Sequence, residues 1–312
     1  KGRVVYVEGD AGIGKTRLLY EFEHGMSEGS ATVLRGLCQS AGRIAPFEPF
    51  QQVLRQRLLP STQLARAEAL LELEASLLGL DAKLADSLPQ LAQLLFLDED
   101  PEFPTSRESS QTAIRQALIA VLLAVSKQTP LVLLLDDWHW ADDASWQALR
   151  DLSSLANSNP LLIIVGSRVT DRPSLADAHQ DTLRLLPFTS REAEIAAQSW
   201  VSGTLDAKAV LTLIERAGGN PLFLEELCLS WSVESKLRAA GPEASRVPST
   251  LHGLVASRIE RLPARHAELV RIAAVLGTEF EAELLAEVSA FSDVLSLLQD
   301  LAGYDLIYAT ET

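Results

Sequence analysis

The sequence is short of basic residues, and this shortage argues against two classes of function. Its 312 residues contain 27 Lys and Arg against 42 Asp and Glu, so the formal net charge is −15. A protein that binds a nucleic-acid backbone needs clustered Lys and Arg, and one that docks on an anionic membrane needs a basic surface. The acidic balance therefore argues against direct nucleic-acid contact and against membrane docking by this segment.

Cysteines and long apolar runs are also scarce. Cys38 and Cys228 lie far apart and match no metal-binding spacing, so we expect two buried, reduced thiols. No apolar run approaches the roughly 20 residues of a membrane span, and no secretory signal opens the sequence. These features favour a cytoplasmic location. Because the first predicted strand begins almost at residue 1, we expect the sequence to be a piece of a longer protein.

The sequence does contain a glycine-rich segment, GDAGIGKT, at residues 9–16. It matches the G-x-x-x-x-G-K-[ST] pattern of a phosphate-binding loop, in which backbone N–H groups surround phosphate oxygens. The apolar residues 4–7 before it predict a buried parallel strand, and Leu18, Leu19 and Phe22 after it recur at helical spacing. This context favours a phosphate site over an ordinary glycine-rich turn.

The chemistry of such a site gives roles to the residues of this segment. Lys15 is expected to reach the β- and γ-phosphates, and the hydroxyl of Thr16 to hold Mg²⁺. The helix that begins near Gly14 adds its positive dipole end. The residues expected to bind the nucleotide here are Gly9, Ala11, Gly12, Ile13, Gly14, Lys15, Thr16 and Arg17.

A second motif ends the wholly apolar run LVLLL at residues 131–135, which predicts a strand buried on both faces. Asp136 and Asp137 follow it, at the carboxyl end where ligands bind in doubly wound sheets. Asp136 is expected to hold Mg²⁺, mostly through water, and Asp137 to orient or deprotonate the attacking water. Because a phosphate-binding loop precedes it in the sequence, we interpret this pattern as a Walker B motif.

Two further side chains follow the predicted strands. His139 lies between two tryptophans, which suggests a ligand or a general base, but we favour a packed turn that caps the next helix. Arg168 comes just after the apolar run 161–166. A cation at the carboxyl end of a strand can reach the γ-phosphate, and a surface salt bridge is the alternative.

The order of elements predicts an α/β fold, with a P-loop NTPase parallel sheet and helices on both of its faces. An all-α lid and a winged-helix-like module are expected to follow. We assign residues 1–187 to the nucleotide-binding domain, with a helical insertion at about 50–128 that packs on the sheet. The lid is expected at 188–240, and the last module, which has room for a terminal strand pair, at 246–312.

Together these motifs resemble the ATPase core of the STAND class, the signal-transduction ATPases with numerous domains. The similarity is to the modules of bacterial LuxR-type and SARP/BTAD-type transcriptional regulators and of adenylyl-cyclase-linked proteins. The segments that carry it are residues 9–16, VLRG at 33–36 with Pro46 and Pro49, LLLDDWHWAD at 133–142, Arg168, GGNPLFLEEL at 218–227 and residues 247–262.

The resemblance implies a slowly ATP-hydrolysing regulatory switch with ATP or ADP and Mg²⁺ as ligands. It implies catalytic roles for Lys15, Asp137 and Arg168, with Arg168 sensing the γ-phosphate, and it implies that Pro221 lies against the adenine. It also implies effector and sensor domains on the same longer chain, and a homo-oligomer whose assembly depends on the nucleotide.

The main alternative is an AAA+ remodelling motor or an origin-binding ATPase with a DNA-reading winged helix. It would need an arginine finger acting in trans, for which Arg172 is a candidate, and a lid arginine, where the sequence instead has Glu225 and Glu226. The acidic balance further disfavours DNA reading. A degenerate binding scaffold and a P-loop kinase are weaker alternatives, because the site residues are intact and no acceptor pocket can be argued.

Overall fold

The computed structural model describes residues 2–27, 29–39, 45–61, 65–96, 108–168, 180–200, 207–238, 253, 256, 259, 262–277, 280–289, 291, 293–303 and 306–308. The chain divides into two compact units, Lys1–Leu186 and Pro187–Thr312. No helix in these described stretches is long and apolar enough to cross a membrane.

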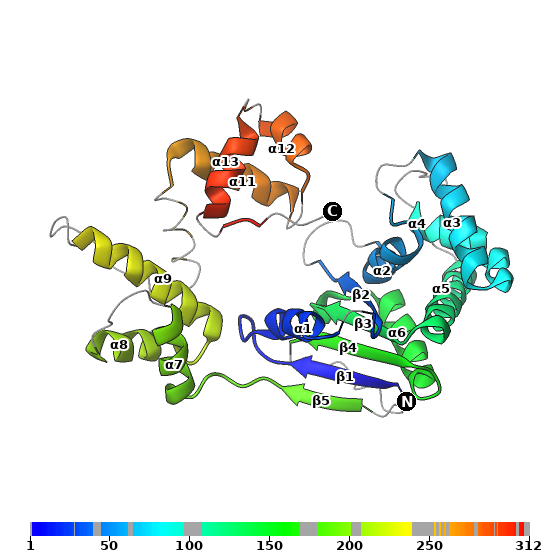
Figure 1. Ribbon diagram of the computed structural model, residues 1–312, viewed down its shortest axis with the longest axis horizontal. Helices are drawn as coiled ribbons and strands as arrows, with labels where there is room; N and C mark the ends of the chain where they lie inside the picture. Colours follow the sequence, from blue (N-terminus) through cyan, green and yellow to red (C-terminus); the bar gives the residue numbers. More distant parts are fainter. Residues whose placement is uncertain are drawn as a thin grey trace. The chain divides into compact units, whose positions relative to one another are not determined.

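The first unit is built on a five-stranded parallel sheet with the strand order β2-β3-β4-β1-β5 (Figure 1). The strands are β1 (Arg3–Glu8), β2 (Thr32–Leu37), β3 (Leu131–Asp136), β4 (Leu161–Ser167) and β5 (Gln180–Arg184). β4 lies between β1 and β3 and pairs with both in parallel. The strand before the phosphate loop and the strand before the two acids therefore end at the same edge of the sheet.

Helices cover both faces of this sheet, which confirms the predicted α/β fold. On one face, Leu19 of α1 (Lys15–His24) packs with Val7 and Ile164 of the sheet. On the other, α5 (Glu108–Gln128) and α6 (Asp143–Ala156) contribute Leu118 and Leu149 to a core that also contains Leu133. The same core includes buried leucines of α2 (Glu48–Leu58), α3 (Arg66–Leu80), η1 (Ala82–Ser87) and α4 (Leu88–Leu95). The insertion thus packs on the sheet, as the sequence predicted.

Two glutamines of α2 lie along the outer edge of β2. The side-chain amide of Gln52 accepts from the N–H of Leu37 at 2.7 Å and donates to its carbonyl at 3.1 Å. Gln56 makes the same pair of bonds with Arg35, at 3.0 and 2.9 Å. The glutamines are one helical turn apart and their partners are two strand residues apart, so the two amides occupy the place of a neighbouring strand.

The second unit begins with three helices, α7 (Ser190–Trp200), α8 (Ala207–Ala217) and α9 (Pro221–Arg238), around a small apolar core. Thr189 and Glu192 form a capping box at the start of α7, since each side chain accepts a hydrogen bond from the other residue's N–H. The N–H of Phe188 donates to the carbonyl of Gly219 at 2.8 Å. This bond joins the first residues of the unit to the turn between α8 and α9.

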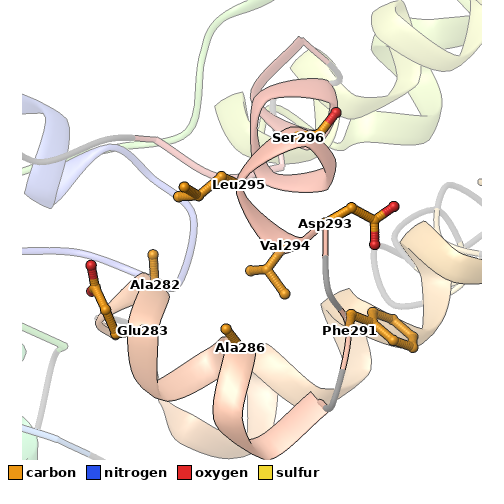
Figure 2. A pocket seen from close by; sticks show the side chains of 8 residues that line it. All are labelled: Ala282, Glu283, Ala286, Phe291, Asp293, Val294, Leu295 and Ser296. Atoms are coloured by element: carbon orange, nitrogen blue, oxygen red, sulfur yellow. The ribbon is translucent and has the colours of Figure 1, made fainter.

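Three more helices, α11 (Ala264–Leu276), α12 (Ala282–Ser289) and α13 (Val294–Gly303), surround a second apolar core that includes Leu269, Leu285 and Leu301. A small pocket opens between α12 and α13, where Ala286, Phe291 and Val294 line it (Figure 2). The described residues 306–308 are not in a strand, so the part of the expected strand pair that falls on them is absent. The lid and winged-helix limits stay predictions.

Neither cysteine forms a disulfide and both are buried, as expected. Burial raises the pKa of the Cys38 thiol far above its usual range and that of Cys228 to about 11. Neither thiol is therefore ionised near neutral pH, which makes them inert apolar side chains of the two units.

Candidate nucleotide-binding site

The loop between β1 and α1 has the backbone of an anion-binding turn. Gly12 and Gly14 have φ values of 74° and 102°, in the left-handed region that favours glycine. Gly9 donates its N–H to the carbonyl of Ser167 at 3.3 Å. A Cβ atom on Gly9 would lie 2.7 Å from Cγ2 of Ile13. Glycine is therefore required by conformation at two positions of the loop and by space at a third.

The side chain of Lys15, the first residue of α1, turns back into this loop. Its Nζ donates to the carbonyls of Gly9 at 3.0 Å and Asp10 at 2.8 Å, and the residue is 7% exposed. Burial lowers the pKa of the Lys15 ammonium, against the opposing charges of Asp137 and Asp136. Both acceptors are uncharged carbonyls, so the positive charge is left for an anionic ligand.

Thr16 and Asp136 meet at the same place. The hydroxyl of Thr16 donates to Oδ2 of Asp136 at 2.6 Å, and the N–H of Asp137 donates to Oδ1 of Asp136 at 2.8 Å. A hydroxyl beside a carboxylate fits Mg²⁺, which binds one or two carboxylates and completes its shell with phosphate oxygens and water. The described residues contain no group of three His, Cys, Asp or Glu that could hold a metal by themselves.

Gly166 of β4 is a site residue that the sequence analysis did not single out. A Cβ atom at this position would lie 2.4 Å from Oδ1 of Asp136. Only a glycine therefore fits at this position of β4, because the carboxylate of Asp136 from the neighbouring β3 occupies the space of a Cβ atom. The available signal was a glycine near the end of an otherwise apolar strand, which often marks a close approach.

Asp137 has different surroundings from Asp136. It has φ 50° and immediately precedes η3 (Trp138–Trp140). Its side chain is 44% exposed, whereas Asp136 as a whole residue is 8% exposed. Burial, and after it the charge of Asp136, raises the pKa of the Asp137 carboxyl above its usual range. The charges of His139, Lys15 and Arg168 act in the opposite direction and lower the same pKa.

His139 and Arg168 complete the group at the strand ends. Nδ1 of His139 lies 3.9 Å from Oδ1 of Asp137, and the imidazole side chain is 7% exposed. Burial, and after it the charge of Arg168, lowers the pKa of His139. The carbonyl of Arg168 accepts from the hydroxyl of Ser167 at 3.0 Å. The charge of Arg168 influences the pKa of Lys15, Asp137 and His139.

The turn after β3 is packed and capped, as the favoured interpretation of the WHW segment predicts. Trp138 is fully buried, with its ring centroid 6.0 Å from that of Phe50 and 5.7 Å from that of Trp146. Asp142 caps α6 by accepting from the N–H of Ser145 at 2.9 Å, and it also accepts from the N–H of Phe47 at 3.2 Å. This packing fixes the backbone that carries the acids.

Two expected nucleotide contacts are not tested by the geometry. The guanidinium of Arg17 pairs with Glu21 at 2.5 Å and lies over the ring of Tyr20, so its side chain follows α1 away from the loop. A nucleotide contact by Arg17 would have to use its backbone. Pro221 is the first residue of α9 in the second unit. Its adenine contact stays a prediction.

A sequence profile of the AAA ATPase domain family matches residues 1–164, which include the loop, Lys15, Thr16 and both acids. The chain belongs to this family. AAA ATPase domains generally bind a nucleotide with Mg²⁺, so the match agrees with the predicted cofactors. The predicted P-loop ATPase family is thereby confirmed for the first unit.

This AAA ATPase domain is also similar to longer proteins. An uncharacterised protein of Rhizobium meliloti (strain 1021) is 30% identical over 298 residues, which cover 91% of this chain and 28% of the relative. A STAND protein with a tetratricopeptide repeat sensor from Pyrococcus horikoshii has a similar fold, with a TM-score of 0.50 and 15% identity over 96% of this chain and 36% of that one. A Walker-type ATPase of Pyrococcus abyssi aligns with a TM-score of 0.42 and 14% identity over 97% of this chain and 85% of that one.

Proposed function

We propose that this AAA ATPase domain binds ATP or ADP with Mg²⁺, hydrolyses ATP slowly, and acts as a regulatory switch within a larger signalling protein. The observation that carries the proposal is the meeting of two segments far apart in sequence. Thr16 from the loop and Asp136 from β3 are joined at 2.6 Å, beside the buried ammonium of Lys15. Such a constellation suits a triphosphate–metal complex.

In this proposal the loop binds the phosphates. Lys15 would exchange its two carbonyl acceptors for phosphate oxygens, and the N–H groups at the start of α1, where a helix has no acceptors of its own, would donate to the same anion. The contacting residues would be Gly9, Ala11, Gly12, Ile13, Gly14, Lys15, Thr16 and the backbone of Arg17. Thr16 and Asp136 would hold Mg²⁺, and the bound ion would neutralise charge on the phosphates.

Hydrolysis requires a water molecule aligned with the γ-phosphorus. In the proposed step the water oxygen bonds to that phosphorus, the bond to the terminal oxygen of ADP breaks, and inorganic phosphate leaves. Asp137 would accept the water proton, because its carboxylate is half-exposed while Asp136 is occupied by two hydrogen bonds. Arg168 would stabilise the charge of the γ-phosphate and so distinguish ATP from ADP.

The switch needs groups that meet the nucleotide differently in two states, because a ligand shifts an equilibrium only through differential affinity. Arg168 and the turn before Pro221 are the candidates. A Cβ atom on Gly219 would lie 2.8 Å from the carbonyl oxygen of Phe188, so this turn is closely packed on the first residues of its unit. We propose that Pro221 lies against the adenine when ADP closes the lid, and that ATP opens it.

The remaining parts of the proposal concern the longer protein. The chain spans 28% of its Rhizobium relative, so effector and sensor domains on the same polypeptide are part of the proposal. The resemblance to bacterial regulators suggests transcriptional regulation as the output, with assembly into a homo-oligomer in the ATP state. Neither a membrane nor direct nucleic-acid contact by this segment is part of it.

Two measurements test the proposed function. Calorimetry should detect MgATP and MgADP binding, and a sensitive phosphate-release assay should detect slow turnover. Light scattering of the longer native protein should then give a larger mass with a non-hydrolysable ATP analogue than with ADP. Absence of nucleotide binding would overturn the proposal, and equal masses in both states would overturn its switch component.

A further inference from the structure

His139 is a buried imidazole for which the fold supplies no hydrogen-bond partner. Its side chain is 7% exposed, and neither ring nitrogen is bonded within the described part of the chain. Buried polar atoms are nearly always paired, because leaving one unpaired costs its full desolvation. The nearest carboxylate oxygen, Oδ1 of Asp137, is 3.9 Å from Nδ1, which is too long for a hydrogen bond.

The ring is held on a fixed backbone beside this carboxylate. The N–H of Trp140 donates to the carbonyl of Asp137 at 2.9 Å, and the N–H of Ala141 donates to that of Trp138 at 3.0 Å. The rings of His139 and Trp140 lie with centroids 5.1 Å apart. The backbone of this turn thus holds the imidazole beside Asp137, whose side chain is 44% exposed.

Charged groups from three other positions influence the same ring. Lys15 at the loop, Arg168 after β4 and Asp136 at the end of β3 all interact with His139 electrostatically. The geometry places the imidazole next to Asp137, the residue proposed to act on the attacking water, with Nδ1 3.9 Å from its Oδ1. A short rotation of Asp137 would pair an otherwise unsatisfied ring nitrogen.

We propose that His139 is a positioning residue for Asp137. In the nucleotide-bound protein, its Nδ1–H donates a hydrogen bond to one oxygen of the Asp137 carboxylate. The other oxygen is thereby held toward the water and accepts its proton. This inference rests on the proposed role of Asp137 in hydrolysis and adds a residue to it.

The kinetic test compares His139→Phe, which keeps a ring without a donor, with His139→Gln, which keeps an N–H donor. His139→Phe should lower kcat by about 10- to 100-fold, since a displacement of about 1 Å in a catalytic group can cost up to about 100-fold. The KM for MgATP should stay within about twofold. His139→Gln should recover most of the rate, and the control His24→Phe, at an exposed histidine of α1, should match the unmodified protein.

A double variant separates positioning from a structural effect. In an Asp137→Asn background, His139→Phe should reduce kcat no further, because the group that it positions is already lost. An equal further reduction, or an unchanged kcat in the single variant, would overturn the proposal. Full activity of Asp137→Asn alone would instead contradict the proposed function, so the two failures are distinguishable.

A spectroscopic test does not depend on turnover. With MgADP and aluminium fluoride bound to the unmodified protein, NMR should show a slowly exchanging Nδ1–H proton of His139, and Asp137→Ala should abolish it. Persistence of that signal in Asp137→Ala, or its absence from the bound unmodified protein, would overturn the hydrogen bond.

Discussion

The two sides of the nucleotide site differ in how far their polar groups are satisfied. On the loop side, residues 9–16, the Lys15 ammonium has two carbonyl acceptors and the glycine backbone is already curved. On the acid side, Asp136 has two hydrogen bonds, but Asp137 is half-exposed and His139 is unpaired among the described residues. We infer that the loop side is organised for binding before the ligand arrives, and that the acid side completes its bonds afterwards.

The largest expected effect is on MgATP binding by the loop side. Lys15→Ala removes the ammonium, and we expect MgATP binding to weaken by at least about 100-fold, since hydrogen bonds to charged groups contribute about 1.5–3 kcal/mol each. Isothermal calorimetry measures the change, with Lys127→Ala, at an exposed lysine near the end of α5, as the control. Tight MgATP binding by the Lys15 variant would refute the role of this side chain.

The next largest effect is on turnover, which depends on the acid side, and it leaves nucleotide binding by the loop side unchanged. Asp137→Asn keeps the shape of the side chain but cannot accept a proton, so kcat should fall by at least about 100-fold, as general-base catalysis contributes about 10²–10⁴-fold. The dissociation constant of MgATP should change little. Phosphate release and calorimetry test both parts, with the exposed Asp143→Asn as the control. Unchanged phosphate release would contradict the assigned role.

A smaller effect concerns the fit of Asp136 against its neighbouring strand. Gly166→Ala would introduce a Cβ atom 2.4 Å from the carboxylate and displace it. We expect the Mg²⁺ concentration for half-maximal turnover to rise, and the free energy of unfolding to fall by about 1–3 kcal/mol from overpacking. Gly79→Ala is the matched control, because a Cβ there would meet nothing within 4 Å. Equal Mg²⁺ dependence in the two variants would argue against the crowding at Asp136.

The smallest expected effect is on the stability of the turn that carries Asp136 and Asp137. Asp142→Ala removes the cap of α6 and the acceptor of the Phe47 N–H, which should lower the free energy of unfolding by about 1–2 kcal/mol. Urea denaturation measures this loss. Asp81→Ala, which removes an exposed cap of η1, should cost less. If Asp142→Ala abolished MgATP binding, the loop side would not be independent of the acid side.

Much of the first unit could be predicted because buried parallel strands consist of continuous apolar residues. Arg3–Glu8 and the strand that ends at Asp136 lie where the pattern indicated. A glycine in an apolar strand indicated a close approach at Gly166, but not that its partner is Asp136, because that contact depends on which strands are neighbours. Nor could the partner of Arg17 be foreseen, because spacing alone does not say whether a cation turns to a ligand or to Glu21. The gap between His139 and Asp137 is likewise a matter of tertiary distance.

The amides of Gln52 and Gln56 limit how copies of this protein can associate. An unprotected edge strand is a template on which another chain can add by hydrogen bonding. The backbone groups of Arg35 and Leu37 are already hydrogen-bonded to these amides. Addition of another strand to β2 would first require α2 to dissociate from this edge. The proposed nucleotide-dependent assembly would therefore use other surfaces, and the covered edge of β2 protects the sheet against aggregation.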